Sequence, residues 1–240
     1  MKELDRYNGL LAALVVAIGL SSAGFFVSKT LYNSKVSINT AEVKGLAERR
    51  VEADRAFWTI EYSVSGGEDV TKSVLYNRSE RDKVRIIRAL IENGFNESEI
   101  SPGVVRFVEK EYRDEDQNLV EVRYQIRGYV GVETDQVLLV SNARSKMNEL
   151  IAEGLDIRNH APAYHFTRLN EIKPEMLQEA TRNARLAAEE FAANASVKVG
   201  GIREARQGRF SIRDVGNSSG DTKKIKKDVR VVTAITFYLE

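Results

Sequence analysis

The two histidines of the chain, His160 and His165, are the first residues to consider as ligands for a metal ion. They lie five residues apart in the segment 158–169, which is predicted to be a strand. Successive side chains of a strand point to opposite faces, so this odd spacing separates the two rings and one metal ion cannot easily take both. The absence of cysteine excludes disulfides, thiolate-bound zinc and thiol nucleophiles. We therefore predict structural histidines and no metal-binding residues.

Acidic residues gather at the tip of a predicted hairpin, where they could attract a cation such as Ca²⁺. They are Glu109, Glu111, Asp114, Glu115 and Asp116. The stretch lacks the ligand spacing and the glycine of an EF-hand loop, so a solvated hairpin tip is the favoured interpretation. The sequence has no Gly-x-Ser-x-Gly motif, no phosphate-binding glycine-rich loop and no dinucleotide-binding fingerprint. We predict no catalytic residue, no cofactor and no enzymatic activity.

A basic stretch lies near the C-terminal end, inside the segment Asp214–Asp228, which is rich in Gly, Ser, Asn and Lys and is predicted to be a flexible loop. Such a stretch can contact anionic lipid, polysaccharide or an acidic patch on a neighbouring subunit, or it can be a solvated loop. Its lysines are Lys223, Lys224, Lys226 and Lys227.

The charge balance argues against nucleic-acid binding. Removing Lys2, Arg6 and Lys29 from the 36 basic residues leaves 33, and removing Glu3 and Asp5 from the 35 acidic residues also leaves 33. A protein that binds nucleic acid usually has a basic excess, which the part beyond Thr30 lacks. Hydrophobic residues at 42% with 30% charged residues indicate a folded globular chain.

Residues 9–27 contain no charged side chain and are long enough to cross a bilayer once as a helix. A helix in a globular core would show a polar face, which this stretch lacks. A cleaved secretion signal is the alternative, since Ser21, Ser22, Ala23 and Gly24 offer small residues to a peptidase. The apolar run continues beyond them, which favours a retained anchor. The residues predicted to form the anchor are Leu10, Leu11, Leu14, Val15, Ile18, Leu20, Phe25 and Phe26.

Hydrophobic periodicity predicts an α+β protein of largely antiparallel sheets, with about three helices packed on one face. Trp58 and Tyr62 share one strand face and are expected in the core rather than on a ligand platform. The predicted helices are 69–93, 135–153 and 174–195, the last with Pro174 in its first turn. The predicted strands are 36–47, 56–66, 104–113, 119–132, 158–169, 201–212 and 229–240.

Three stretches resemble the SIMPL-domain family of the periplasmic immunogenic protein type, over residues 36–239. They are EVKGL (42–46), AERRVEADRAFWTIEYSVSG (47–66) and ARLAAEEFAANASVKVGGIREA (184–205). Many members carry G-x-G in the opening strand, whereas this chain keeps only the first glycine, Gly45, followed by Leu46 and Ala47. The resemblance implies a bacterial envelope protein that is exported by a signal or anchored by one helix. It also implies a ring-like or cage-like homo-oligomer in some members and a link to envelope or oxidative stress, without an established reaction.

These observations predict a short cytoplasmic tail (1–8), a transmembrane anchor or signal peptide (9–28), a linker (29–35) and a SIMPL-like domain (36–240), with two α+β subdomains as one arrangement. We expect a non-enzymatic envelope protein of the bacterial inner membrane, with its C-terminal domain in the periplasm, that forms a homo-oligomer. Secretion to the periplasm after cleavage is the alternative location. A periplasmic ligand-binding or sensing module is the alternative function, and its ligand is unknown.

Overall fold

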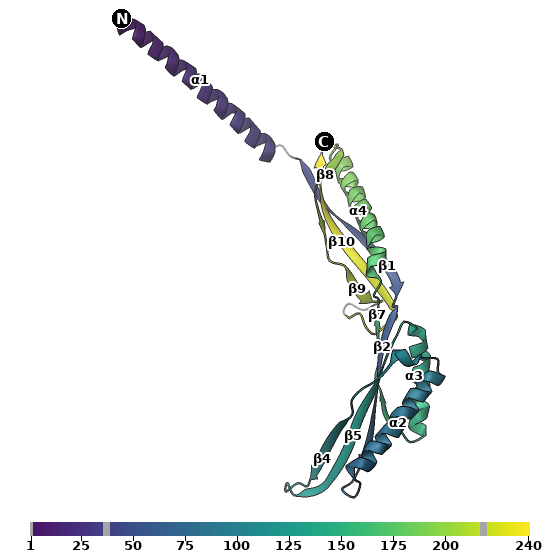
Figure 1. Ribbon diagram of the computed structural model, residues 1–240. Helices are drawn as coiled ribbons and strands as arrows, with labels where there is room; N and C mark the ends of the chain where they lie inside the picture. The colour runs from purple at the N-terminus through teal and green to yellow at the C-terminus, as the bar shows by residue number, and fades with distance from the viewer. Residues whose placement is uncertain (1, 36–38, 217–219) are drawn as a thin grey trace. The chain divides into compact units, whose positions relative to one another are not determined.

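A computed structural model of the chain describes residues 2–35, 39–216 and 220–240, with side chains described for 14–32, 39–216 and 220–240. The chain forms two compact units. The terminal unit comprises Met1–Ala47, Leu177–Arg209 and Val232–Glu240, and the central unit comprises Glu48–Met176 and Phe210–Val231. Both units are built from segments that are distant in the sequence (Figure 1).

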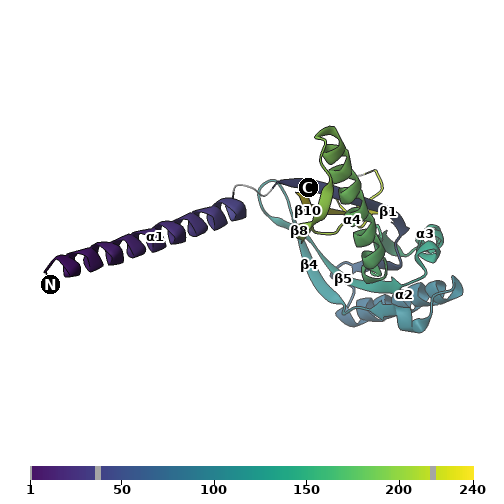
Figure 2. The same cartoon turned by 90° about the horizontal axis from the view of Figure 1, so that it is seen from above.

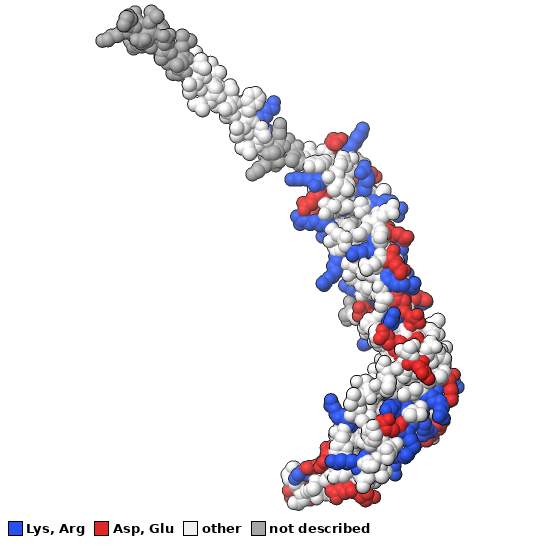
Figure 3. Space-filling model, viewed as in Figure 1, with Lys and Arg blue, Asp and Glu red and all other residues white. Residues whose placement is uncertain are grey.

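The N-terminal helix α1 spans Lys2–Lys35. It covers the expected anchor and also residues 29–35, which were expected to be a linker; that stretch has no glycine or proline to end a helix. The window Leu14–Tyr32 is long and apolar enough to cross a membrane, with a mean hydropathy of 1.7, and none of it is buried within the protein. Figure 3 shows the described part of α1 as almost entirely uncharged, whereas acidic and basic side chains are interspersed over the rest of the visible face.

The central unit holds an antiparallel sheet with the order β3-β5-β2-β6, to which β4 adds beside β5 and β7 beside β2. The alternation of β2 places Trp58 and Ile60 on the buried face, opposite Val132 and Val130 of β5. The strands are β2 (Arg55–Gly66), β3 (Ile100–Pro102), β4 (Arg106–Arg113), β5 (Leu119–Thr134), β6 (Asp156–Asn159) and β7 (Ala163–His165).

Two helices cover one face of this sheet: α2 (Lys72–Glu92) and α3 (Val137–Ala152) (Figures 1 and 2). The hydroxyl of Thr71 accepts a hydrogen bond from the Val74 N–H and caps α2. A short 3-10 helix, η1 (Glu97–Glu99), precedes β3. The core between helices and sheet includes Trp58, Ile60, Tyr62, Ile86, Leu90, Val130, Val140 and Met147. The prediction that Trp58 and Tyr62 are core residues is confirmed, at 1% and 2% exposure.

The terminal unit contains most of a second sheet with the order β1-β10-β8. Helix α4 (Leu169–Asn194) lies along this sheet in both ribbon views (Figures 1 and 2). The core between α4 and this sheet contains Val43, Ala184, Ala188, Ile235 and Phe237. The strands are β1 (Thr40–Glu52), β8 (Val199–Gln207) and β10 (Lys226–Leu239); the short β9 (Ser211–Asp214) pairs with the beginning of β10 in the central unit.

The α+β class with antiparallel sheets is confirmed, and the described residues hold four α-helices, of which α1 is the apolar one. Several boundaries differ from the prediction. Strand β1 runs on through residues 48–52, because the charged Glu48, Arg50 and Glu52 occupy exposed outward positions, where a charge stays in water. Segment 158–169 is not one strand: Pro162, which cannot donate to a ladder, separates β6 from β7.

Helix α4 begins before Pro174, which was expected in its first turn and instead lies inside the helix. The carboxylate of Asp54 holds the start in place. It accepts hydrogen bonds from the N–H groups of Thr167 (2.8 Å) and Arg168 (3.2 Å), just before Leu169. The Arg168 side chain also pairs with Asp54 at 2.9 Å. This cap lies at the turn between β1 and β2, inside the stretch that resembles the SIMPL family.

Candidate functional site

The segment predicted to be a flexible loop, Asp214–Asp228, is held by a buried ion pair among its described residues. Lys227 Nζ lies 2.6 Å from Asp214 Oδ1, and neither side chain is exposed. The same ammonium donates to the carbonyl of Asp221 at 2.6 Å, and Asp214 also accepts the N–H groups of Lys223 and Lys224. The described part of the segment is therefore an ordered turn between β9 and β10, and residues 217–219 lie outside the described residues.

The pKa of Asp214 is set by two opposing effects. Burial raises the pKa of a carboxyl, because a charge is costly away from water. The hydrogen bond from Lys227 and the N–H groups of Lys223 and Lys224 outweigh burial, and the pKa of Asp214 lies below its ordinary value. Asp214 is therefore a carboxylate at neutral pH and fixes the turn as an anion.

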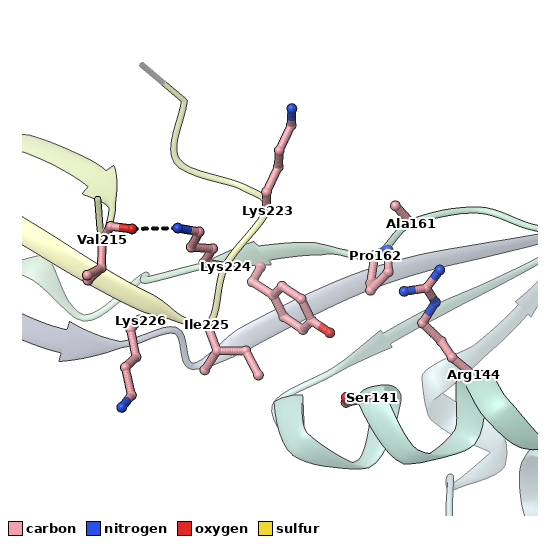
Figure 4. A pocket seen from close by; sticks show the side chains of 10 residues that line it. Ser141, Arg144, Ala161, Pro162, Val215, Lys223, Lys224, Ile225 and Lys226 are labelled. Carbon is pink, nitrogen blue, oxygen red and sulfur yellow. Dashed lines mark hydrogen bonds between the residues drawn. The ribbon is translucent and has the colours of Figure 1, made fainter. Parts of the chain in front are cut away.

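The four lysines of this segment do not form one basic cluster. Lys227 is buried, so its expected contact with a polyanion or a neighbouring subunit is wrong: its charge is already neutralised by Asp214. Lys224 donates to the carbonyl of Val215 at 2.7 Å. Figure 4 shows Lys223 and Lys226 pointing in opposite directions. Lys223, Lys224 and Lys226 stay exposed, and any contact they make with a polyanion stays a prediction.

A pocket with a volume of about 640 Å³ lies between this turn, α3 and β7. We call it the Arg144 pocket. Its lining contains the basic residues Arg144, Lys223, Lys224 and Lys226 and no carboxylate. In Figure 4, Arg144 reaches the pocket from α3 beside Pro162, and Lys224 lies on the other side. Within the described residues, the buried Arg144 Nε has no hydrogen-bond partner.

Tyr164 of β7 places a phenol in the lining of the Arg144 pocket. Its side chain is 7% exposed, and burial raises its pKa, although the nearby charge of Arg144 acts in the opposite direction. Tyr164 is therefore neutral at pH 7 and its hydroxyl can donate a hydrogen bond. Its main chain is fixed to the turn, because the Tyr164 N–H donates to the carbonyl of Thr222 at 2.7 Å.

The prediction that the two histidines point to opposite faces of one strand is wrong. They do not share one strand, and both rings lie beside residues of the outward face of β2. His160 follows β6, and its Nε2 lies 3.1 Å from Glu61 Oε2. His165 is in β7 and packs edge-on against Phe57, with ring centroids 5.4 Å apart. No three His, Asp or Glu side chains in the part of the chain that the structure describes form a group that could hold a metal ion.

The face of the central sheet away from α2 and α3 carries a polar network. The hydroxyl of Ser63 contacts the carboxylate of Asp156 and accepts a hydrogen bond from Gln125 Nε2 at 3.0 Å. Arg127 Nε donates to Gln125 Oε1 at 2.9 Å. A serine hydrolase with a Ser-His-Asp triad needs a histidine between the nucleophilic serine and the acid. In residues 39–216 and 220–240 no histidine is hydrogen-bonded to Ser63, so this Ser–Asp contact is not a catalytic triad.

The acidic residues at the tip of the β4–β5 hairpin stabilise its turn. Asp114 accepts the Asn118 N–H at 2.8 Å and its amide at 3.1 Å, and these bonds lower the pKa of Asp114. Glu111 pairs with Arg113 at 2.7 Å. Two of the five carboxylates considered as cation ligands are thus occupied by neighbours in the hairpin.

The predicted anchor residues show what α1 presents to its surroundings. Its described apolar side chains are 54% to 70% exposed, all around the helix. They include Leu14, Val15, Ile18, Leu20, Phe25 and Phe26, while the side chains of Leu10 and Leu11 lie outside the described residues. The buried-core interpretation of this helix therefore has no support from the described side chains, and the helix could be a membrane span or a signal sequence.

The fold and these sites define an α+β protein with antiparallel sheets and an N-terminal apolar helix. The family model SIMPL, described as "Protein of unknown function (DUF541)", matches residues 41–233. The chain belongs to the SIMPL family, as its sequence resemblance predicted.

The other comparisons add little. No curated protein matches the chain. Among solved structures, the chain is similar to an uncharacterized conserved protein from Listeria innocua at 10% sequence identity, covering 77% of this chain and 90% of that chain, with a TM-score of 0.19. This likeness is too low to carry an argument about fold or function.

Sequence reasoning missed Arg144, Tyr164 and the Asp214–Lys227 pair. One signal for Arg144 was present: it directly follows Ala143 and lies four residues after Val140, so it borders the buried stripe of α3. A signal for Lys227 was also present: it continues, two residues earlier, the inward alternation of Val229 and Val231 in β10.

Proposed function

We propose that this protein is a non-enzymatic component of the bacterial cell envelope that is anchored in the inner membrane by α1 and self-assembles into a ring-like or cage-like homo-oligomer. Its C-terminal domain would lie in the periplasm, as the family resemblance implies. The same resemblance supports a role in envelope or oxidative stress. Cleavage of α1 as a signal sequence is the alternative, and the intact mass of the protein extracted from its native membrane distinguishes the two.

The surface of α1 supports the anchor. A helix that is apolar on all sides is stable in water only if other groups cover it. None of the window Leu14–Tyr32 is buried within the protein. Lipid would remove this surface from water, and the backbone hydrogen bonds of a helix are satisfied internally, as a bilayer requires.

The observation that carries the assembly proposal is a ribbon at the end of the β4–β5 hairpin. Strand β2 pairs with β5 only as far as Tyr124, so residues 119–123 of β5 pair with β4 alone. We call residues 110–113 and 119–123 the overhanging ribbon. It exposes Tyr112 (44%), Leu119 (51%) and Val120 (67%). A two-stranded ribbon is marginally stable by itself in water, and a neighbouring copy would cover these side chains.

A free strand edge in the terminal unit supports assembly as well. Strand β8 pairs with β10 on one side, and within the described residues no strand covers its other side. Seven of its nine residues are exposed, including Ile202 at 50%. An exposed edge of this length offers unpaired N–H and C=O groups to a strand of a second copy.

We expect the full chain, extracted in detergent, to have a mass several times its 27.0 kDa after the detergent is subtracted. Val120→Lys should reduce this mass to that of a smaller species, because a buried ammonium in the contact would be unpaired. Light scattering coupled to size-exclusion chromatography measures both.

Val104→Lys is the matched control, since Val104 is 86% exposed and lies outside the overhanging ribbon. Its mass should equal that of the unmodified chain. A monomeric unmodified chain, or an equal loss of mass in both variants, would contradict assembly through the ribbon.

One observation favours the second candidate function, a ligand-binding or sensing module at the membrane. The Arg144 pocket has a volume typical of sites for small molecules, which range from about 300 to 1,000 Å³. Assembly and ligand binding do not exclude each other.

A further inference from the structure

We propose that the Arg144 pocket binds a small organic anion, a carboxylate or phosphate monoester attached to an apolar body, with Arg144 and Tyr164 donating to the anionic group. The inference does not depend on assembly, because all ten lining residues belong to the central unit of one chain.

The charges of the pocket select an anion. Its lining contains no carboxylate, and its positive charge comes mainly from Arg144 and Lys224, because the side chains of Lys223 and Lys226 extend in opposite directions. The acid nearest in sequence, Asp214, is already occupied by the Lys227 ammonium and two N–H groups. Positive charge that no carboxylate of the lining balances raises the local concentration of anions.

Two donors of the pocket, on Arg144 and Tyr164, are free to bind. Among the described residues, Arg144 makes no ion pair, and its buried Nε lacks a hydrogen-bond partner. A buried donor without a partner is unfavourable by itself, so an incoming oxygen gains more here than at a solvated arginine. The hydroxyl of Tyr164 makes no side-chain hydrogen bond within the described residues.

The walls of the pocket select the rest of the ligand. Ala161 and Pro162 line one side, and Val215 and Ile225 come from the turn. These side chains offer no polar group, so an apolar body gains from leaving water against them. Inorganic phosphate would interact with the charged groups of the pocket but would not bury the apolar walls.

The described part of the turn, which forms one wall, is held by hydrogen bonds, and this limits the cost of ordering on binding. The ion pair of Asp214 and Lys227 holds it from inside. The Ala53 N–H donates to the carbonyl of Ile225 at 2.7 Å and ties it to the end of β1.

Phenyl phosphate and phenylacetate are suitable probes, because both are water-soluble and combine one anionic group with one ring. Binding to the full chain in detergent is measured by isothermal titration calorimetry, with empty micelles as the blank. We expect at least one of the two to bind about tenfold or more tightly than phenol, which lacks the charge, and than inorganic phosphate, which lacks the ring. Binding of one probe alone identifies the anionic group that the pocket prefers.

Arg144→Gln should weaken binding of the preferred probe about tenfold or more, because a charge-assisted hydrogen bond is lost. Lys146→Gln is the matched control. It removes one positive charge from the same helix, but Lys146 is exposed, pairs with Glu149 at 3.0 Å and does not line the pocket. Tyr164→Phe, which removes a single oxygen, should weaken binding about threefold or more, and this variant keeps the test decisive if Arg144→Gln fails to fold.

Three results would overturn the proposal. The first is that neither phenyl phosphate nor phenylacetate binds more tightly than phenol and inorganic phosphate. The second is an equal loss of affinity in Arg144→Gln and Lys146→Gln, which would indicate a nonspecific effect of net charge. The third is unchanged binding in Tyr164→Phe when Arg144→Gln is unfolded by circular dichroism.

Discussion

Asp214→Asn is expected to lower the free energy of unfolding of the central unit by about 3 to 5 kcal/mol. The side chains of Asp214 and Lys227 are both fully buried and lie 2.6 Å apart. In Asp214→Asn the Lys227 ammonium stays buried without a charged partner. The free-energy cost of that unpaired charge is larger than the net stabilisation by the intact ion pair. Urea unfolding can follow the change through the fluorescence of Trp58, the single tryptophan, which is 1% exposed in the same unit.

Two comparisons test whether the loss comes from the ion pair. Asp221→Asn makes the same substitution in the same turn at an exposed side chain, and it should change stability by less than about 0.5 kcal/mol. The double variant Asp214→Asn/Lys227→Met should lose about 1 to 3 kcal/mol less stability than the sum of the two single losses, since each single variant already breaks the same ion pair. Additive losses would show that the two residues act separately.

The lowered pKa of Asp214 also predicts a pH dependence. The unfolded chain binds a proton to this carboxyl near pH 3.9, an approximate reference value, whereas the folded chain does so at lower pH. The contribution of the pair is therefore fully present above the unfolded pKa and is lost as the pH falls through the folded pKa. We expect the stability difference between the unmodified chain and Asp214→Asn to be constant from pH 7 to pH 5 and to shrink below about pH 4. A difference that grows on acidification would contradict this assignment.

The alternating patterns predicted the sheets well because they depend on burial alone. Trp58, Ile60 and Tyr62 alternate with polar residues, and only one register places all three inside. The hairpin between β4 and β5 followed from the same alternation, and the three helices after α1 followed from apolar residues at helical spacing.

The boundaries and the pocket depended on contacts that no local pattern encodes. Asp54 holds the start of α4 although it lies 113 residues before Thr167. The alternation of β10 places Lys227 on the inward face with Val229, but only the ladder shows that its partner there is Asp214. Lysine and aspartate are rarely buried, and then only in pairs, so sequence rules assign both residue types to the surface.

The SIMPL-like strand motif has a physical reason that the structure makes plain. A Cβ added to Gly45 would lie 1.8 Å from the carbonyl oxygen of Ala180 and 2.5 Å from the N of Ala184, both in the backbone of α4. The helix can therefore approach β1 this closely only if residue 45 is glycine. Ala47, which stands where many members have the second glycine, is 1% exposed. Its Cβ is accommodated, so the missing second glycine leaves strand β1 intact.

Gly45→Ala is accordingly expected to destabilise the terminal unit by about 3 kcal/mol, at the upper end of the usual cost of overpacking, because the atoms in the way are backbone and cannot rotate aside. Far-UV circular dichroism during urea unfolding should report this loss. Trp58 reports on the central unit, so its transition should shift less if the two units unfold separately.

Gly201→Ala is the matched control for this prediction. Gly201 lies in β8 of the same unit, and an added Cβ would meet no atom within 4 Å. The substitution should leave stability unchanged or raise it by less than about 1 kcal/mol, since alanine restricts the unfolded chain. If Gly45→Ala proved as harmless as Gly201→Ala, the close packing of α4 on β1 would not be what requires glycine at position 45. If both variants lost about 3 kcal/mol, the cost would come from replacing a strand glycine as such.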